Sequence, residues 1–132
     1  IKGFIGISSA PEFLERLMWK KFSKKIKKII FTKKIYILDH GGFNYPITKQ
    51  LILDGRKNKI LDEKINIKIP IVLLHGLKDK VVPLHISKKI FSICNKSKRK
   101  LIKIKNGDHS LSRKIDLKKI CKELNILIFD RL

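Results

Sequence analysis

Short apolar runs alternate along this chain with segments whose apolar residues have helical spacing. Residues 3–7 and 71–74 are apolar at nearly every position, which is typical of strands buried in a parallel sheet. Within residues 100–105, Ile102 and Ile104 alternate with Leu101, Lys103 and Lys105, and this period of two predicts another strand. The segment at 71–74 follows Pro70 and has the clearest strand pattern of the three.

Helical patterns separate these strands. Ser9 stands three residues before Glu12, with Pro11 between them, and this capping-box signature predicts a helix that continues to about Ile30. The Gly41-Gly42 pair closes a brief extended stretch at 35–38.

Three further helices are expected. Pro46 opens one that runs to about Arg56, and Ile86, Ile90 and Cys94 mark another that follows Pro83. The last runs from about Arg113 to residue 128.

The order of these elements predicts an α/β fold, with a parallel sheet and helices packed on its faces. The length of 132 residues suits one small domain. The elements at about 11–58 interrupt the alternation of strand and helix. They are expected to form an insertion between two sheet strands, where a lid would lie.

Two chemically capable side chains follow two of the predicted strands. Asp79 lies in the loop after the strand at 71–74, and His109 follows the strand at 100–105. Loops that leave the carboxyl ends of neighbouring parallel strands emerge at the same edge of the sheet. We therefore expect a carboxylate and an imidazole to meet there, an arrangement in which a buried acid orients a base.

These residues lie in motifs that resemble those of the α/β-hydrolase superfamily. Residues 75–83 resemble its H-G-x-x-D-x-x-V-P loop, and residues 107–109 resemble its G-D-H turn. Further segments at 6–13, 17–19, 45–48, 54–56 and 108–113 are similar, in collinear order, to a bacterial group related to the mitochondrial acyl-protein thioesterase. The resemblance implies the C-terminal half of a serine hydrolase, with Asp79 as the triad acid and His109 as the general base.

The nucleophilic serine is the part of the triad that this sequence does not supply clearly. Residues 6–10 only approach the G-x-S-x-G elbow, because the second glycine is missing and Pro11 follows closely. In the resembling group this run is the strand after the helix of the nucleophile. We therefore expect Ser8 not to be the nucleophile, and expect both the elbow and the oxyanion loop to belong to a separate N-terminal half.

Other residues have simpler interpretations. His75 is expected to have a structural part at its strand end, and His40 and His85 to lie on the surface or lid. Three aromatic residues either line an acyl pocket or, as the simpler interpretation, pack the lid against the sheet: Trp19, Phe22 and Tyr45.

Composition changes this interpretation little. The net charge of +21 comes mainly from lysines spread along the whole chain, and arginine, which reads bases, is scarce. This favours a solvated surface and non-specific adhesion to polyanions over a specific nucleic-acid partner. The sequence contains no apolar run long enough to predict a membrane span. Cys94 and Cys121 lack metal-binding spacing, which suits a reducing cytoplasm.

The sequence thus predicts hydrolysis of an ester or thioester by acyl transfer to water, with no metal or organic cofactor. The expected partners are a small acyl substrate and the N-terminal half of the same domain. Two alternatives stay open: a non-catalytic remnant of the fold and a basic binding protein. If the chain is the C-terminal half of a serine hydrolase, these residues alone should show no significant ester turnover. The strand at 3–7 should then have an unpaired apolar edge.

Overall fold

The computed structural model describes residues 1–130, which divide into two compact units. Unit 1 comprises Ile1–Pro11 and the described residues from Leu61 onward, and unit 2 comprises Glu12–Ile60. The bounds of unit 2 lie within two residues of the insertion expected at 11–58. Its role as a lid stays a prediction.

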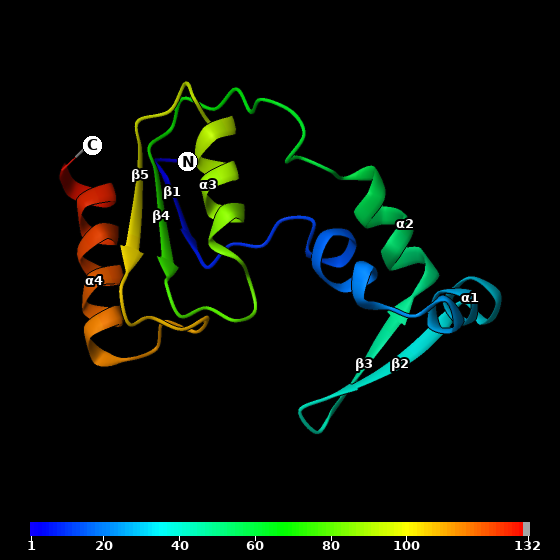
Figure 1. The fold of residues 1–132 in the computed structure, drawn as a ribbon. Helices are drawn as coiled ribbons and strands as arrows, with labels where there is room; N and C mark the ends of the chain where they lie inside the picture. Colours follow the sequence, from blue (N-terminus) through cyan, green and yellow to red (C-terminus); the bar gives the residue numbers. More distant parts are fainter. Residues whose placement is uncertain (131–132) are drawn as a thin grey trace. The chain divides into compact units, whose positions relative to one another are not determined.

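Unit 1 is built on a parallel sheet of three strands in the order β1-β4-β5 (Figure 1). The strands are β1 (Phe4–Ile7), β4 (Ile71–Gly76) and β5 (Arg99–Ile104). All six residues of β4 are buried, as expected for a central strand with a neighbour on each edge and helices on both faces. The predicted parallel sheet with flanking helices is confirmed.

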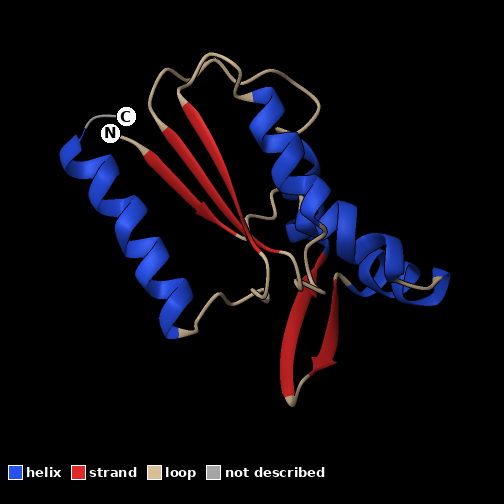
Figure 2. Ribbon diagram, turned by 60° about the vertical axis from the view of Figure 1, so that its left-hand side comes forward, coloured by secondary structure: helices blue, strands red, loops and turns tan. Residues whose placement is uncertain are grey.

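Two helices cover the sheet, α3 (Leu84–Ile93) on one face and α4 (Lys114–Asn125) on the other (Figures 1 and 2). A short π-helical turn, η3 (Ile126–Asp130), continues α4. The core beneath α4 includes Ile120 and the following buried residues: Val72, Leu74, Ile102, Ile104, Leu111 and Leu127. Because successive side chains of a strand point to opposite faces, Ile71, Leu73 and His75 of β4 face α3.

Strand β1 lies at an edge of this sheet. It pairs with β4, with Phe4 opposite Ile71, and no other strand of residues 1–130 pairs with it. Phe4 and Ile7 are 47% and 41% exposed. The N-terminal half that is expected to cover this edge stays a prediction.

Unit 2 combines two helices with an antiparallel hairpin. Helix α1 (Lys24–Lys33) leads into strand β2 (Ile35–His40), and strand β3 (Phe43–Thr48) leads into helix α2 (Lys49–Lys57). Two short helical turns precede them, η1 (Leu14–Met18) and η2 (Trp19–Lys21). The core of unit 2 consists of Phe22, Ile30, Ile47 and Ile52, surrounded by partly buried aromatic and aliphatic residues.

The single helix predicted from Pro11 to Ile30 is wrong. Glu12 has a left-handed backbone, with φ of 59°, so it does not continue a helix from Ser9. Its carboxylate instead accepts a hydrogen bond from the backbone N–H of Ile60 (2.7 Å), which joins the two ends of unit 2. The true α-helix starts later, where the hydroxyl of Ser23 accepts the N–H of Ile26 as an N-cap.

The helix predicted to open at Pro46 is also wrong at its start. Gly41 and Gly42 both have positive φ, and the turn they form directs residues 43–48 back along β2 as a strand. Pro46 lies in that strand, opposite Ile37. Helix α2 begins only after Thr48, whose hydroxyl accepts the N–H of Leu51 (3.0 Å).

Candidate active site

The candidate site lies where β4 and β5 end. These parallel neighbours finish at the same edge, and the loops that follow them are joined by backbone hydrogen bonds. The N–H of Lys78 donates to the carbonyl oxygen of Gly107 (2.8 Å), and the N–H of Leu77 donates to that of Ile104 (2.9 Å). The two loops are thereby held in a fixed relation before any side chain is considered.

Gly76 permits this close approach. A Cβ atom at this position would lie 2.3 Å from the carbonyl oxygen of Asp108 and 2.4 Å from that of Gly107. Such distances are far inside van der Waals contact, so only glycine allows the turn at 107–108 to lie against the end of β4. The close packing at the end of β4 therefore explains why the H-G-x-x-D motif has a glycine at this position.

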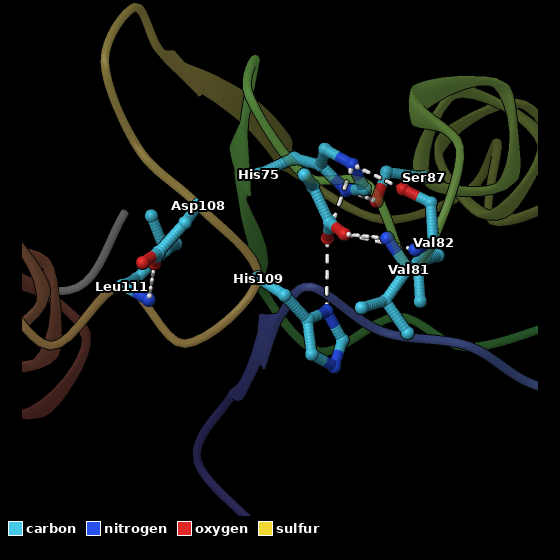
Figure 3. A network of polar contacts seen from close by, with 8 residues as sticks. His75, Val81, Val82, Ser87, Asp108, His109 and Leu111 are labelled. Atoms are coloured by element: carbon cyan, nitrogen blue, oxygen red, sulfur yellow. Dashed lines mark hydrogen bonds and ion pairs between the residues drawn. The ribbon is translucent and has the colours of Figure 1, made fainter. Parts of the chain in front are cut away.

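Asp79 and His109 meet at this edge, as the sequence predicts. Nδ1 of His109 lies 2.9 Å from Oδ2 of Asp79 (Figure 3). The carboxylate side chain is only 1% exposed, whereas the imidazole is 42% exposed. A buried acid thus contacts a ring that remains open to solvent on its other side.

Backbone amides prepare Asp79 to act as an anion. Its Oδ1 accepts the N–H groups of Val81 and Val82, both at 2.8 Å. Burial raises the pKa of Asp79, but the hydrogen bonds from Val82, His109 and Val81, with the charge of His109, outweigh it, so the pKa lies below the ordinary value of 3.8. The carboxylate is therefore ionised at neutral pH and acts only as an acceptor.

The bond to Asp79 fixes the hydrogen of the His109 ring. An ionised carboxylate donates no hydrogen, so Nδ1 of His109 donates and the neutral ring carries its lone pair on Nε2. Nε2 makes no hydrogen bond to any residue from 1 to 130. An imidazole held in this way can accept a proton at Nε2.

Relatives of the chain exist among curated proteins, although no protein-family model matches it. The mitochondrial palmitoyl-protein thioesterase ABHD10 of Bos taurus is 31% identical over 84 residues, which are 64% of this chain and 28% of the relative. The human protein of the same name is 24% identical over 133 residues, covering 97% of this chain and 42% of the relative. Because both relatives are named mitochondrial, the expected cytoplasmic location stays a prediction.

Solved structures agree with these relatives. A protein of Agrobacterium vitis S4, described as a hydrolase, has a TM-score of 0.87 at 22% identity over 96% of this chain and 49% of that one. Mouse α/β-hydrolase domain-containing protein 10 has a TM-score of 0.74 at 25% identity, over 96% of this chain and 52% of the mouse chain. The chain is a relative of the α/β-hydrolases. It spans about half the length of these two solved structures and less than half of the curated relatives.

Ser8, at the end of β1, lies at the same edge of this part of the α/β-hydrolase fold. Its N–H donates to the carbonyl oxygen of Leu74 (2.9 Å), and its backbone is left-handed, with φ of 45°. The residue is 5% exposed, and its hydroxyl oxygen has no hydrogen-bond partner among the described residues. Ser8 therefore does not bond to the imidazole of His109, and the expectation that it is not the nucleophile stays a prediction.

The remaining candidates lie outside this pair. His75 is fully buried beside Asp79, while His40 and His85 are exposed.

Trp19 and Phe22 pack in the core of unit 2, whereas Tyr45 is 46% exposed and contacts Phe43. No sequence pattern indicates Ser87, which bonds to His75 from helix α3.

No metal centre or membrane-spanning helix is found in the described part of the chain. Nowhere within residues 1–130 do three or more His, Cys, Asp and Glu side chains gather closely enough to hold a metal ion. None of the helices there has the length and apolar character needed to cross a bilayer.

Proposed function

We propose that this chain carries the acid and the base of a serine hydrolase that acts on esters or thioesters, with Asp79 and His109 in these roles. The observation that carries the proposal is the 2.9 Å contact between a buried carboxylate and a half-exposed imidazole. The relation to thioesterases and other hydrolases supports this class of reaction. The acyl group and the leaving group stay open.

In the proposed reaction, Nε2 of His109 removes the proton from a serine hydroxyl as the oxygen attacks the acyl carbonyl. The proton then passes to the leaving group as the tetrahedral intermediate collapses to an acyl-enzyme. A water molecule, deprotonated by the same imidazole, releases the acid. Asp79 holds the ring in the tautomer that keeps Nε2 free, and it stabilises the imidazolium that forms.

The nucleophile and the oxyanion donors would come from an N-terminal half of the domain. The 132 residues contain no G-x-S-x-G sequence. We expect the chain by itself to hydrolyse p-nitrophenyl esters no faster than a matched protein blank. A clear rate that Ser8→Ala abolishes would show instead that Ser8 is the nucleophile.

A chimera tests the roles of Asp79 and His109 directly. The part of the mouse relative that this chain matches is replaced by residues 1–132, so that the mouse protein supplies its own remaining half. Folding is checked by circular dichroism, and hydrolysis of a p-nitrophenyl ester and of an acyl thioester is measured. We expect turnover that falls by about 10⁴-fold or more in His109→Ala and in Asp79→Asn.

His85→Ala is the matched control, because His85 is an exposed histidine at the start of helix α3. Its turnover should equal that of the unsubstituted chimera. The proposal fails if a folded chimera shows no turnover, or if His109→Ala and His85→Ala retain the same activity.

A further inference from the structure

His75 is a buried titratable side chain that the proposed reaction does not use. It is the residue before Gly76 in strand β4 and is 0% exposed. Nδ1 lies 2.8 Å from the hydroxyl oxygen of Ser87, in helix α3, and Nε2 lies 3.0 Å from the carbonyl oxygen of Val82. Both ring nitrogens are therefore bonded inside the protein (Figure 3).

The partners of His75 determine where its hydrogen lies. A carbonyl oxygen only accepts, so Nε2 carries the hydrogen and donates it to Val82. In the neutral ring, Nδ1 then accepts the hydroxyl hydrogen of Ser87, which is itself 1% exposed. The hydroxyl of Ser87 in helix α3 thus donates a hydrogen bond to the ring of His75. The ring in turn donates to the carbonyl of Val82, in the loop that bears Asp79.

Val82 connects this pair to the acid. Its carbonyl oxygen accepts from His75, while its N–H donates to Oδ1 of Asp79 at 2.8 Å. The other carboxylate oxygen, Oδ2, faces Nδ1 of His109 at 2.9 Å and lies 3.7 Å from Nε2 of His75. A continuous path of hydrogen bonds therefore runs from Ser87 through His75 and Val82 to Asp79, and ends at the exposed ring.

We infer that His75 and Ser87 are positioning residues for the acid of the site: they hold the loop from Asp79 to Val82 so that one carboxylate oxygen binds the loop amides and the other faces His109. This inference rests on the roles proposed above for Asp79 and His109. It predicts that a hydroxyl on helix α3, remote from the substrate, determines how well the imidazole is oriented.

Ser97→Ala provides a matched control for Ser87→Ala. Ser97 is likewise a buried serine of unit 1, and its hydroxyl donates to the carbonyl oxygen of Ile67 (2.6 Å). Both substitutions remove one buried hydroxyl that makes one hydrogen bond in the same unit. Only Ser87 is connected to Asp79, so a general loss of stability and a loss of positioning are distinguishable.

The first experiment uses the full chain and needs no turnover. Histidine is labelled with ¹⁵N and aspartate with ¹³C, and two signals are followed: the downfield Nδ1 proton of His109 and the carboxyl titration of Asp79. In Ser87→Ala and in His75→Gln we expect the proton signal to weaken or move upfield. We also expect the pKa of Asp79, which lies below 3.8 in the unsubstituted protein, to rise.

Ser97→Ala should leave both signals unchanged, and Ser87→Thr, which retains the hydroxyl, should restore them. The inference is wrong if folded Ser87→Ala and His75→Gln both give the signals of the unsubstituted protein. It is also wrong if Ser97→Ala shifts them equally.

The second readout uses the chimera described above. A displaced acid should lower kcat with KM unchanged, because the substrate does not contact helix α3 on this inference. For Ser87→Ala we expect a loss of about tenfold to 10²-fold, the scale of a misplacement of about 1 Å. An inactive chimera together with intact spectroscopic effects would overturn the proposed function and leave the hydrogen-bond path in place. An active chimera unaffected by Ser87→Ala would overturn the path alone.

Discussion

The two units of this chain are stabilised in different ways. Among the described residues, the polar ones that are buried as whole residues lie in unit 1: Ser8, His75, Ser87, Ser97, Asp116 and Glu123. The core of unit 2 is apolar, and its aromatic residues contact one another edge to face, as Trp19 does with Phe22 and Phe31. Its buried carboxylate, Glu12, lies at the border of the unit, where the side chain is 2% exposed. Unit 1 therefore depends on directional bonds between buried groups, and unit 2 depends mainly on apolar packing.

Charge follows the same division. In unit 2, the guanidinium of Arg56 lies 5.0 Å from the ring centroid of Trp19, and the ammonium of Lys27 lies 5.3 Å from the same centroid. These cations lie over aromatic surface, and the guanidinium of Arg56 also donates to the carboxylate of Glu15 at 2.9 Å. In unit 1, the buried carboxylates are held by specific partners within the unit, as Lys100 holds Glu123 at 2.8 Å. In unit 2 such a bond is found at the border, where Arg16 donates to Glu12 at 2.6 Å. Substitutions should accordingly act through lost volume in unit 2 and through lost geometry in unit 1.

The largest effect is expected from Ile30→Ala in helix α1. Ile30 is 0% exposed in the core of unit 2, and removal of its side chain leaves a cavity that costs about 2–5 kcal/mol. Urea unfolding gives the cost, and hydrogen exchange is measured separately for residues 12–60 and for unit 1.

Ile37→Ala is the control for this substitution, because Ile37 is 50% exposed in the same unit. Its cost should stay within about 0.5 kcal/mol. The contrast between the units is wrong if Ile30→Ala reduces protection in the β4 and β5 region as strongly as in residues 12–60.

A smaller effect on stability, and a larger one on the site, is expected from Gly76→Ala. The added methyl group would meet backbone carbonyl oxygens, which cannot move as a flexible side chain can. We expect a loss of about 1–3 kcal/mol, together with loss of the His109 Nδ1 proton signal, because the turn at 107–108 must withdraw.

The same substitution at Gly55, in helix α2, should change the free energy of unfolding in the opposite direction. The nearest atom to its added Cβ lies 3.6 Å away, at ordinary contact distance. Alanine favours a helix interior over glycine by about 0.5–1 kcal/mol, so Gly55→Ala should stabilise the protein. Equal effects at the two glycines, measured by urea unfolding, would show that packing at the strand end is not the cause.

The candidate pair could be predicted from the sequence because its determinants are local. Pro70 and four apolar residues specify a buried strand, and the geometry of parallel strands then brings the loops bearing Asp79 and His109 to one edge. The motifs around them supplied the proposed roles. The contact itself is confirmed by the structure, while catalysis stays a proposal.

The rest depends on contacts between distant residues. Nothing near Ser87 in the sequence shows that its hydroxyl reaches His75, because that bond depends on how helix α3 packs against β4. The single helix predicted from Pro11 does not form for a similar reason, since the carboxylate of Glu12 bonds to Ile60 at the far end of unit 2. The helix start predicted at Pro46 is wrong because proline is tolerated both at a helix start and in the edge strand of a hairpin.

The smallest effect is expected in the pH dependence that Asp79 gives to stability. Its pKa in the folded state lies below the ordinary value of 3.8, so the unfolded chain binds the proton more tightly. The stabilisation is therefore complete above about pH 4 and is lost as the pH falls through the folded-state pKa. The pKa of Asp116 is also lowered, by its hydrogen bond from Arg113, and would produce a loss of the same sign.

Asp79→Asn is compared with the parent protein by subtracting their free energies of unfolding. This subtraction removes the contribution of Asp116, because both proteins contain that residue. It also largely cancels the repulsion caused by the net charge of +21. The difference in unfolding free energy, measured from about pH 5 to about pH 2, should shrink as the pH falls. A difference that stays constant over this range would mean that the Val81 and Val82 amides do not hold a charged carboxylate. The directional character assigned to unit 1 would then fail at the residue where it matters most.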